Sequence, residues 1–170
     1  MDLTRYIRAI ADFPEPGILF RDITPLLKEP KAFGYVLDRF AEVAVERETE
    51  VVVGIESRGF LFGAPLSDRL DLPFVPVRKP GKLPAAHMSV EYSLEYGENQ
   101  LDIHEDAVAE GQRCLVVDDL LATGGTARAT AKLIELVHGK VVGFAFLIEL
   151  AALGGREQLA GYDTVSILRY

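Results

Sequence analysis

Two adjacent acids followed by a loop of small residues form the stretch of this chain that is best suited to chemistry. Asp118 and Asp119 end an apolar run that begins at Cys114, and a short run of this kind is typical of a buried parallel strand. Open α/β sheets bind their ligands at the carboxyl ends of such strands. We therefore expect this strand to carry both carboxylates into a site.

The loop after the acids, residues 122–126, contains two glycines and two threonines, which is a composition suited to binding phosphate. Glycines let the backbone approach an anion, N–H groups and hydroxyls donate to its oxygens, and the amino terminus of the helix predicted after the loop adds a favourable dipole. Asp118 and Asp119 would repel a bare phosphate, so they need hydroxyl groups or a metal ion as partners. A phosphorylated sugar supplies the anion and the hydroxyls together.

An ordinary strand, turn and helix capped by Thr123 or Thr126 is the alternative interpretation of this stretch. It would explain the glycines and threonines of the loop without any ligand. It does not explain two adjacent aspartates, whose charges repel each other. We therefore favour the ligand site.

A second anion site is predicted where residues 56–59, Glu-Ser-Arg-Gly, follow the apolar run 51–55. These residues lie between a strand end and a helix start, where unpaired N–H groups favour an anion. The spacing of Gly54 and Gly59 also occurs in nucleotide P-loops. A P-loop is excluded, however, because Phe60 and Leu61 stand where Lys and Ser or Thr are required.

A third basic segment follows the predicted strand 73–77. Arg78, Lys79 and Lys82 place three cations within five residues of a chain whose net charge is −8. Most charge runs are solvated loops. Because this one follows a strand end and is shaped by Pro80 and Gly81, we interpret it as a pyrophosphate-binding segment.

Composition and length limit the remaining function classes. A chain of 170 residues with 49% hydrophobic content suits one domain with a sizeable core. The negative net charge argues against general affinity for nucleic acid. No apolar run approaches the roughly 20 residues needed to span a bilayer, so we expect a cytoplasmic protein without a membrane partner. The single Cys114 predicts a core thiol, since neither a disulfide framework nor a zinc cluster can be built from one cysteine.

Apolar periodicity predicts the other elements and an α/β fold class. We expect one domain, residues 1–170, with a mostly parallel central sheet flanked by helices. The predicted helices are residues 3–11, 31–47, one that follows the loop 122–126 and a short one from 154. The predicted strands are residues 18–23, 51–55, 73–77, 114–119, 140–148 and 164–168, with a hairpin formed by residues 90–94 and 99–103.

Residues 114–126 resemble the phosphoribosyl-pyrophosphate-binding motif of the type I phosphoribosyltransferases: a hydrophobic run, two acids, two hydrophobic residues and a small Thr/Gly-rich loop. The resemblance implies the fold of that family. It also implies that Asp118 and Asp119 are catalytic, because they would hold the ribose hydroxyls and stabilise a cationic ring. The ribose 5-phosphate would be bound by Ala122, Thr123, Gly124, Gly125 and Thr126.

The two basic segments are similar to the same family. Residues 78–84, Arg-Lys-Pro-Gly-Lys-Leu-Pro, match its pyrophosphate-binding segment, and the resemblance implies a cis peptide between Ser57 and Arg58. It also implies a homodimer in which Arg78 reaches the site of the partner subunit. The residues that would bind pyrophosphate are Ser57, Arg58, Arg78, Lys79 and Lys82.

Residues 13–27 are similar to the amino-terminal hood that covers the purine ring in adenine phosphoribosyltransferases. A hood in residues 1–30 is therefore implied. The resemblance also covers residues 92–97, Tyr-Ser-Leu-Glu-Tyr-Gly, and implies that Glu95 is catalytic within a flexible lid formed by the loop and hairpin 78–104. It extends from about Phe13 to Tyr170. The residues implied to bind adenine are Leu19, Phe20, Arg21 and Leu150.

The implied activity belongs to purine salvage: adenine and phosphoribosyl pyrophosphate give AMP and pyrophosphate. The implied cofactor is Mg²⁺, held mainly by substrate oxygens and water and by no direct protein ligand. Two alternative functions would use the same phosphate-binding loop, residues 122–126, which we name the phosphate cradle. One is a phosphoribosyltransferase for xanthine, hypoxanthine-guanine or orotate, and the other is a regulator that binds phosphoribosyl pyrophosphate without turnover. A regulator that binds DNA would need a basic helix-turn-helix addition, for which this chain has no spare residues.

Overall fold

The structure is a computed structural model that describes residues 1–94 and 97–170. It divides into two compact units, Met1–Arg39 and Phe40–Tyr170, each of which is described by itself. Glu95, which the sequence analysis implies to be catalytic, lies outside the described residues.

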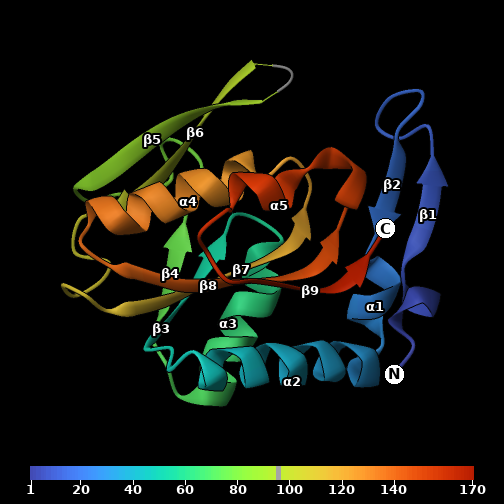
Figure 1. Cartoon of the computed structure of the whole chain (residues 1–170), viewed down its shortest axis with the longest axis horizontal. Helices are drawn as coiled ribbons and strands as arrows, with labels where there is room; N and C mark the ends of the chain where they lie inside the picture. The colour runs from blue at the N-terminus through green and yellow to red at the C-terminus, as the bar shows by residue number, and fades with distance from the viewer. Residues whose placement is uncertain (95–96) are drawn as a thin grey trace. The chain divides into compact units, whose positions relative to one another are not determined.

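A five-stranded parallel sheet forms the centre of the larger unit, in the order β4-β3-β7-β8-β9 (Figure 1). The unbroken apolar runs of β3 and β8 are typical of strands covered on both faces, and β7 lies between them. The predicted strands and the predicted α/β class are therefore confirmed. The bounds are β3 Val51–Ile55, β4 Phe74–Val77, β7 Arg113–Leu121, β8 Lys140–Glu149 and β9 Thr164–Arg169.

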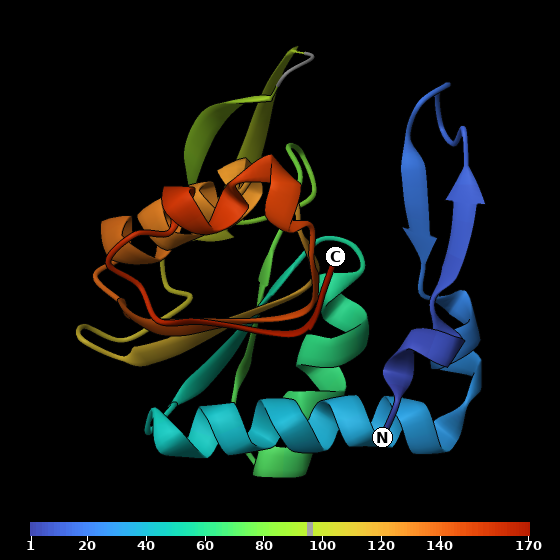
Figure 2. The same cartoon turned by 45° about the vertical axis from the view of Figure 1, so that its right-hand side comes forward.

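Helices cover both faces of this sheet. The helix α3, Gly59–Leu70, lies on one face, and α4, Gly125–Leu136, lies on the other together with the short α5, Gly155–Gln158 (Figures 1 and 2). A 3₁₀ turn, η2 Ala151–Leu153, precedes α5. Phe40, in the last part of α2, Pro30–Glu46, contacts the Phe62 ring of α3 with 6.0 Å between centroids. The helices expected over residues 31–47, after the loop 122–126 and from residue 154 are thus present, and the predicted core thiol of Cys114 is fully buried in β7.

The predicted hairpin is confirmed and is longer than expected. Strands β5, His87–Leu94, and β6, Gly97–His104, pair in antiparallel register from His87↔His104 to Leu94↔Gly97. Val90 and Leu101 are buried and join the core cluster that contains the inner face of α4. The base of the hairpin is therefore anchored to the sheet domain, while its far end projects from it.

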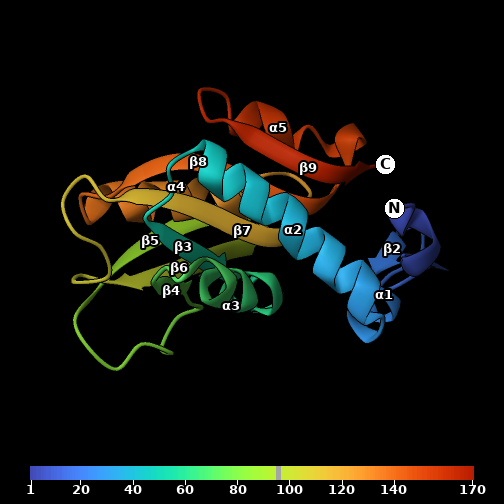
Figure 3. The same ribbon diagram turned by 90° about the horizontal axis from the view of Figure 1, so that it is seen from below.

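The smaller unit holds a 3₁₀ turn, η1 Leu3–Tyr6, a two-stranded antiparallel sheet of β1 Arg8–Ala11 and β2 Leu19–Asp22, the short α1 Thr24–Lys28 and the first part of α2 (Figure 3). The Phe13 and Phe20 rings meet edge to face with 5.1 Å between centroids. The extended segment predicted at residues 18–23 is confirmed.

The helix predicted over residues 3–11 is wrong beyond Tyr6. Residues 8–11 form a strand instead, paired from Arg8↔Asp22 to Ala11↔Leu19. An isolated helix of nine residues is marginal in water, and the turn that contains Pro14, Pro16 and Gly17 brings a complementary strand into hydrogen-bonding range. Pairing with that strand therefore outweighs the weak helical periodicity.

Within the described ranges, no helix has both the length and the apolar composition needed to cross a bilayer.

Candidate active site

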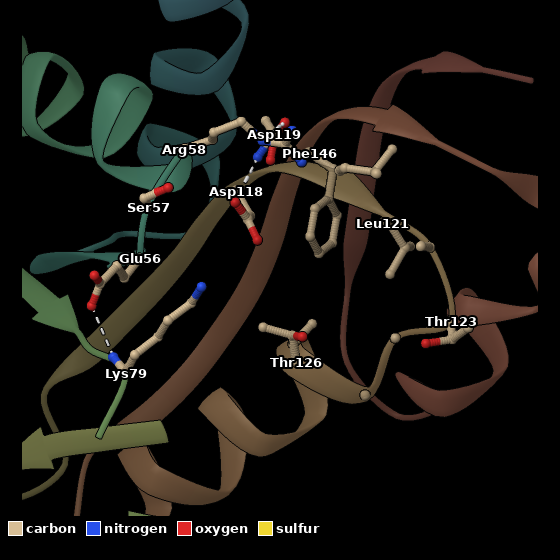
Figure 4. A pocket seen from close by; sticks show the side chains of 15 residues that line it. Glu56, Ser57, Arg58, Lys79, Asp118, Asp119, Leu121, Thr123, Thr126 and Phe146 are labelled. Atoms are coloured by element: carbon tan, nitrogen blue, oxygen red, sulfur yellow. Dashed lines mark hydrogen bonds and ion pairs between the residues drawn. The ribbon is translucent and has the colours of Figure 1, made fainter. Parts of the chain in front are cut away.

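A cavity of about 420 Å³ opens where β3 and β7 end and α4 begins (Figure 4). Its wall combines segments that are far apart in the sequence. Ser57 and Arg58 come from the end of β3, Lys79 follows β4, the acids belong to β7, and the loop 122–126 leads into α4. The structure thus gathers most of the residues predicted for a phosphorylated-sugar site around one cavity.

The two aspartates face different partners because successive strand residues point to opposite sides. Asp118 points into the cavity, whereas Asp119 is turned toward Arg58 (Figure 4). The Arg58 Nε lies 2.7 Å from Asp119 Oδ2, and the Asp119 side chain is only 6% exposed. The Asp119 N–H donates to Asp118 Oδ1 at 2.9 Å. One acid is therefore paired with a cation, and the other is presented to a ligand.

The position of Asp118 depends on a close approach of α3 to β7. A Cβ added to Gly59 would lie 2.7 Å from the Val117 carbonyl oxygen and 3.0 Å from Asp118 Oδ1. Only glycine leaves room there. The first residue of α3 is therefore a glycine because a larger residue would displace the acid or the strand that carries it.

Both acids lie in surroundings that disfavour the charged form of their carboxyl groups. Burial raises the pKa of the Asp118 carboxyl well above its usual range, and the neighbouring charge of Asp119 raises it further. Burial also raises the pKa of Asp119, against the opposing effect of the Arg58 guanidinium. A positive charge that develops in the cavity would relieve this unfavourable arrangement.

The loop 122–126 has the geometry of an anion site. Gly124, with φ of +86°, is the N-cap residue of α4 and makes no side-chain cap hydrogen bond. Neither Thr123 nor Thr126 caps the helix, so the alternative interpretation as an ordinary capped turn is not supported. The N–H groups of a first helical turn have no acceptor within the helix, and here they border the cavity. The Thr126 hydroxyl donates to the Tyr92 Oη of β5 at 3.2 Å.

The predicted pyrophosphate residues divide into two groups. Ser57, Arg58 and Lys79 line the cavity, and the Lys79 side chain points into it (Figure 4). Arg78 and Lys82 do not line this cavity. The Arg78 Nε donates to Glu56 Oε2 at 2.9 Å, and Lys82 is exposed on the loop.

Glu56 lines the cavity although the sequence analysis gave it no role. Its Oε2 accepts from the Arg78 side chain and, at 2.9 Å, from the Lys79 N–H, and the Lys79 N–H bond is the main cause of its lowered pKa. The signal was available, because Glu56 directly follows the strand 51–55. Phe146 also lines the cavity, since it pairs with Asp118 across β7 and β8; within the apolar run of β8 nothing distinguished it from a core residue.

The cis peptide implied between Ser57 and Arg58 is found one residue earlier, between Glu56 and Ser57. The Ser57 carbonyl accepts from the Phe60 N–H at 3.2 Å, and the Arg58 carbonyl accepts from the Leu61 N–H at 3.1 Å. The bond between Ser57 and Arg58 therefore lies in the hydrogen-bonded turn that leads into α3. Helical turns are built from trans peptides, so the cis bond precedes that turn.

The residues predicted to bind adenine belong to both units. Leu19, Phe20 and Arg21 form most of β2 in the smaller unit. Leu150 follows β8 in the larger unit, where its N–H donates to the Leu121 carbonyl at 2.9 Å. Their combined role in binding a base stays a prediction.

The chain matches a known family over most of its length. The model of the phosphoribosyl transferase domain matches residues 28–167. Adenine phosphoribosyltransferase of Gloeobacter violaceus is 61% identical over 171 residues that cover all of both chains. The enzyme of the same name from Acaryochloris marina is 57% identical, again over both chains in full.

Solved structures agree with the sequence matches. The crystal structure of adenine phosphoribosyltransferase from Thermoanaerobacter pseudethanolicus superposes with a TM-score of 0.96 at 54% identity, covering 99% of this chain and 98% of that one. The Saccharomyces cerevisiae enzyme, complexed with an imino-altritol bisphosphate and adenine, gives a TM-score of 0.93 at 36% identity, covering 98% and 97%. The chain therefore belongs to the phosphoribosyl transferase domain family and, within it, to the adenine phosphoribosyltransferases.

Proposed function

We propose that this protein acts in purine salvage by transferring the 5-phosphoribosyl group of phosphoribosyl pyrophosphate to adenine, giving AMP and pyrophosphate. One observation carries the proposal: an acid pair and a phosphate cradle follow each other at the end of β7 and line one cavity. The full-length relatives named adenine phosphoribosyltransferase support the choice of base. They do not favour the xanthine, hypoxanthine-guanine or regulator alternatives.

The proposed reaction exchanges one bond at the anomeric carbon of the sugar. A ring nitrogen of adenine attacks this carbon, the bond to pyrophosphate breaks with its electron pair on the leaving oxygen, and the ring nitrogen loses a proton. Positive charge grows on the ribose ring as the bond breaks. Asp118 points into the cavity from a half-buried position at the end of β7, where a fixed carboxylate stabilises such charge more than it would in water.

The two ends of the sugar substrate would bind on different sides of the cavity. We assign the 5′-phosphate to the N–H groups and hydroxyls of residues 122–126, because the loop begins α4 and contains the glycine that lets an anion approach. We assign the pyrophosphate to Ser57, Arg58 and Lys79 on the opposite wall. Arg78 would act through Glu56, which it contacts, and Lys82 would act from the exposed loop.

Magnesium is proposed as the cofactor and is best held by the substrate. Among the described residues, no group of three His, Cys, Asp or Glu side chains could hold a metal ion. Mg²⁺ keeps several waters and binds readily to substrate phosphate oxygens, which fits the substrate as its holder. When bound, Mg²⁺ would supply charge neutralisation to the departing pyrophosphate.

The remaining assignments rest on the family resemblance. Glu95 would accept the proton of adenine within the closed hairpin, and Leu19, Phe20, Arg21 and Leu150 would hold the base. The Saccharomyces cerevisiae relative is complexed with adenine and the Giardia lamblia relative with 9-deazaadenine, which supports an adenine site here. The homodimer and the cytoplasmic location stay predictions from the sequence.

A product assay tests the proposed function directly. The protein is incubated with phosphoribosyl pyrophosphate, Mg²⁺ and, separately, adenine, hypoxanthine, guanine and xanthine. We expect AMP from adenine and at least 10²-fold lower turnover of the other bases, because mispaired buried polar groups cost about 1–3 kcal/mol each. Comparable turnover of hypoxanthine, or binding of phosphoribosyl pyrophosphate with no product, would contradict the proposal.

Asp118→Asn should lower turnover and raise stability at neutral pH. The amide cannot stabilise a cationic ring as a carboxylate does, so we expect kcat to fall by about 10²-fold or more. The pKa of Asp118 is raised in the folded protein, so folding stability falls as pH rises through the window between its unfolded and folded values. Removing the charge should increase Tm by about 2–4 °C for each kcal/mol recovered.

The gain in Tm should shrink as the pH approaches 4, because protonation then neutralises Asp118 in the parent protein as well. Asp163→Asn is the matched control, since Asp163 pairs with Arg47 on the surface and its loss should not raise Tm. A lower Tm for Asp118→Asn at pH 7, or unchanged kcat, would contradict the placement of this charge.

Lys79→Ala should weaken binding of phosphoribosyl pyrophosphate about tenfold, which is the loss expected for one charge-assisted hydrogen bond. AMP binding should stay nearly unchanged, because AMP has no pyrophosphate. Lys82→Ala is the control: it removes the same charge from the same loop, but outside the cavity. Calorimetric titration of both ligands measures the four affinities. Equal losses for Lys79→Ala and Lys82→Ala would contradict Lys79 as the principal cation.

A further inference from the structure

The phosphate cradle rests on the backbone of a segment that the proposed mechanism does not use. A Cβ added to Gly155 would lie 2.1 Å from the Ala122 carbonyl oxygen and 3.0 Å from the Gly124 nitrogen. A Cβ added to Gly124 would lie 2.5 Å from the Gly155 carbonyl oxygen. The two backbones are therefore in direct contact, with no side chain between them. A shift of Gly155 toward residues 122–124 must therefore move that loop.

The residue after Gly155 fixes this segment to the sheet. The Arg156 Nε donates to Glu149 Oε1 at 3.0 Å, its Nη2 donates to Glu149 Oε2, and its Nη1 donates to the Thr164 carbonyl at 2.7 Å. A planar guanidinium that meets both carboxylate oxygens is held in position and orientation. The start of α5 is thus tied to both β8 and β9.

Glu149 also links its ion pair with Arg156 to the end of β7, which leads into the loop 122–126. It is the last residue of β8, its side chain is 2% exposed, and it pairs in register with Leu121, which directly precedes the loop 122–126. The Leu150 N–H donates to the Leu121 carbonyl at 2.9 Å. One ion pair therefore links the strand end that enters the cradle with the helix start that supports it from behind.

We propose that Gly155 and the Arg156–Glu149 ion pair are positioning residues for the 5′-phosphate: they hold the N–H groups of residues 122–126 in their binding arrangement before the ligand arrives. The inference rests on the proposed function, which assigns the 5′-phosphate to this loop. A preorganised loop pays less ordering entropy when it binds. Loosening the support should therefore weaken phosphate binding specifically and leave the opposite wall of the cavity intact.

The test compares Arg156→Lys with Arg113→Lys. Lysine keeps the charge of Arg156 but cannot make the fork of hydrogen bonds. Arg113 is a matched control, because it donates to the Arg47 and Glu48 carbonyls at the opposite end of β7 and so supports the fold away from the cavity. Gly155→Ala is a second variant that acts on the cradle by steric contact.

The readout is the ratio of adenosine Kd to AMP Kd, which isolates the contribution of the 5′-phosphate. Titration of pyrophosphate with Mg²⁺ and the Tm of each variant accompany it. For Arg156→Lys we expect the ratio to fall on the order of tenfold, with pyrophosphate affinity within about twofold of the parent. Arg113→Lys should lower Tm and leave the ratio unchanged. Gly155→Ala should act like Arg156→Lys.

Each other outcome overturns a defined part of the account. If the parent protein binds adenosine and AMP equally well, the assignment of the 5′-phosphate to the loop fails, and the inference fails with it. If the parent prefers AMP and Arg156→Lys keeps that preference, the positioning role is wrong while the proposed function stands. If the affinities of both lysine variants for AMP, adenosine and pyrophosphate all fall in step with their Tm, the ion pair stabilises the fold and has no specific role in phosphate binding.

Discussion

The site depends on one electrostatic constraint: two adjacent carboxylates are held at the end of a buried strand, where both charges are disfavoured. Burial raises the pKa of both acids, and the Arg58 Nε lies 2.7 Å from Asp119 Oδ2. Asp118 is left to face the cavity. A fold that tolerates this arrangement forgoes stability at the place where a cationic sugar ring would be stabilised, which is the usual relation between strain and function.

Close backbone contacts make the arrangement possible. Gly59 lets α3 approach β7 beside Asp118, and Gly155 lets the start of α5 support the loop that follows the acids. In both places a methyl group would fall well inside van der Waals distance. The glycines of this chain therefore contribute more than flexible turns: Gly59 allows the short distance between α3 and the sheet, and Gly155 allows the short distance between α5 and the loop 122–126.

Features that depend on the residues of one strand could be predicted from the sequence. Features that depend on contact with a distant segment of the chain could not. The runs at residues 51–55 and 140–148 were recognisable because strands covered on both faces are apolar throughout. Residues 8–11 were mistaken for helix because their pairing partner is a separate segment. Phe146 lies at the cavity because it pairs in register with Asp118. The Lys79 N–H bond to Glu56 distinguishes Lys79 from Lys82. Neither contact could be predicted from the sequence, because each joins residues of separate segments.

A crystal structure of the protein with bound AMP tests the central claim most directly, because it locates the phosphate and the ribose together. The account predicts phosphate oxygens at about 2.7–3.2 Å from the N–H groups of residues 122–126, the ordinary hydrogen-bond range, with a ribose hydroxyl donating to Asp118. A phosphate bound instead to Arg58 and Lys79, with Asp118 facing no part of the ribose, would contradict it.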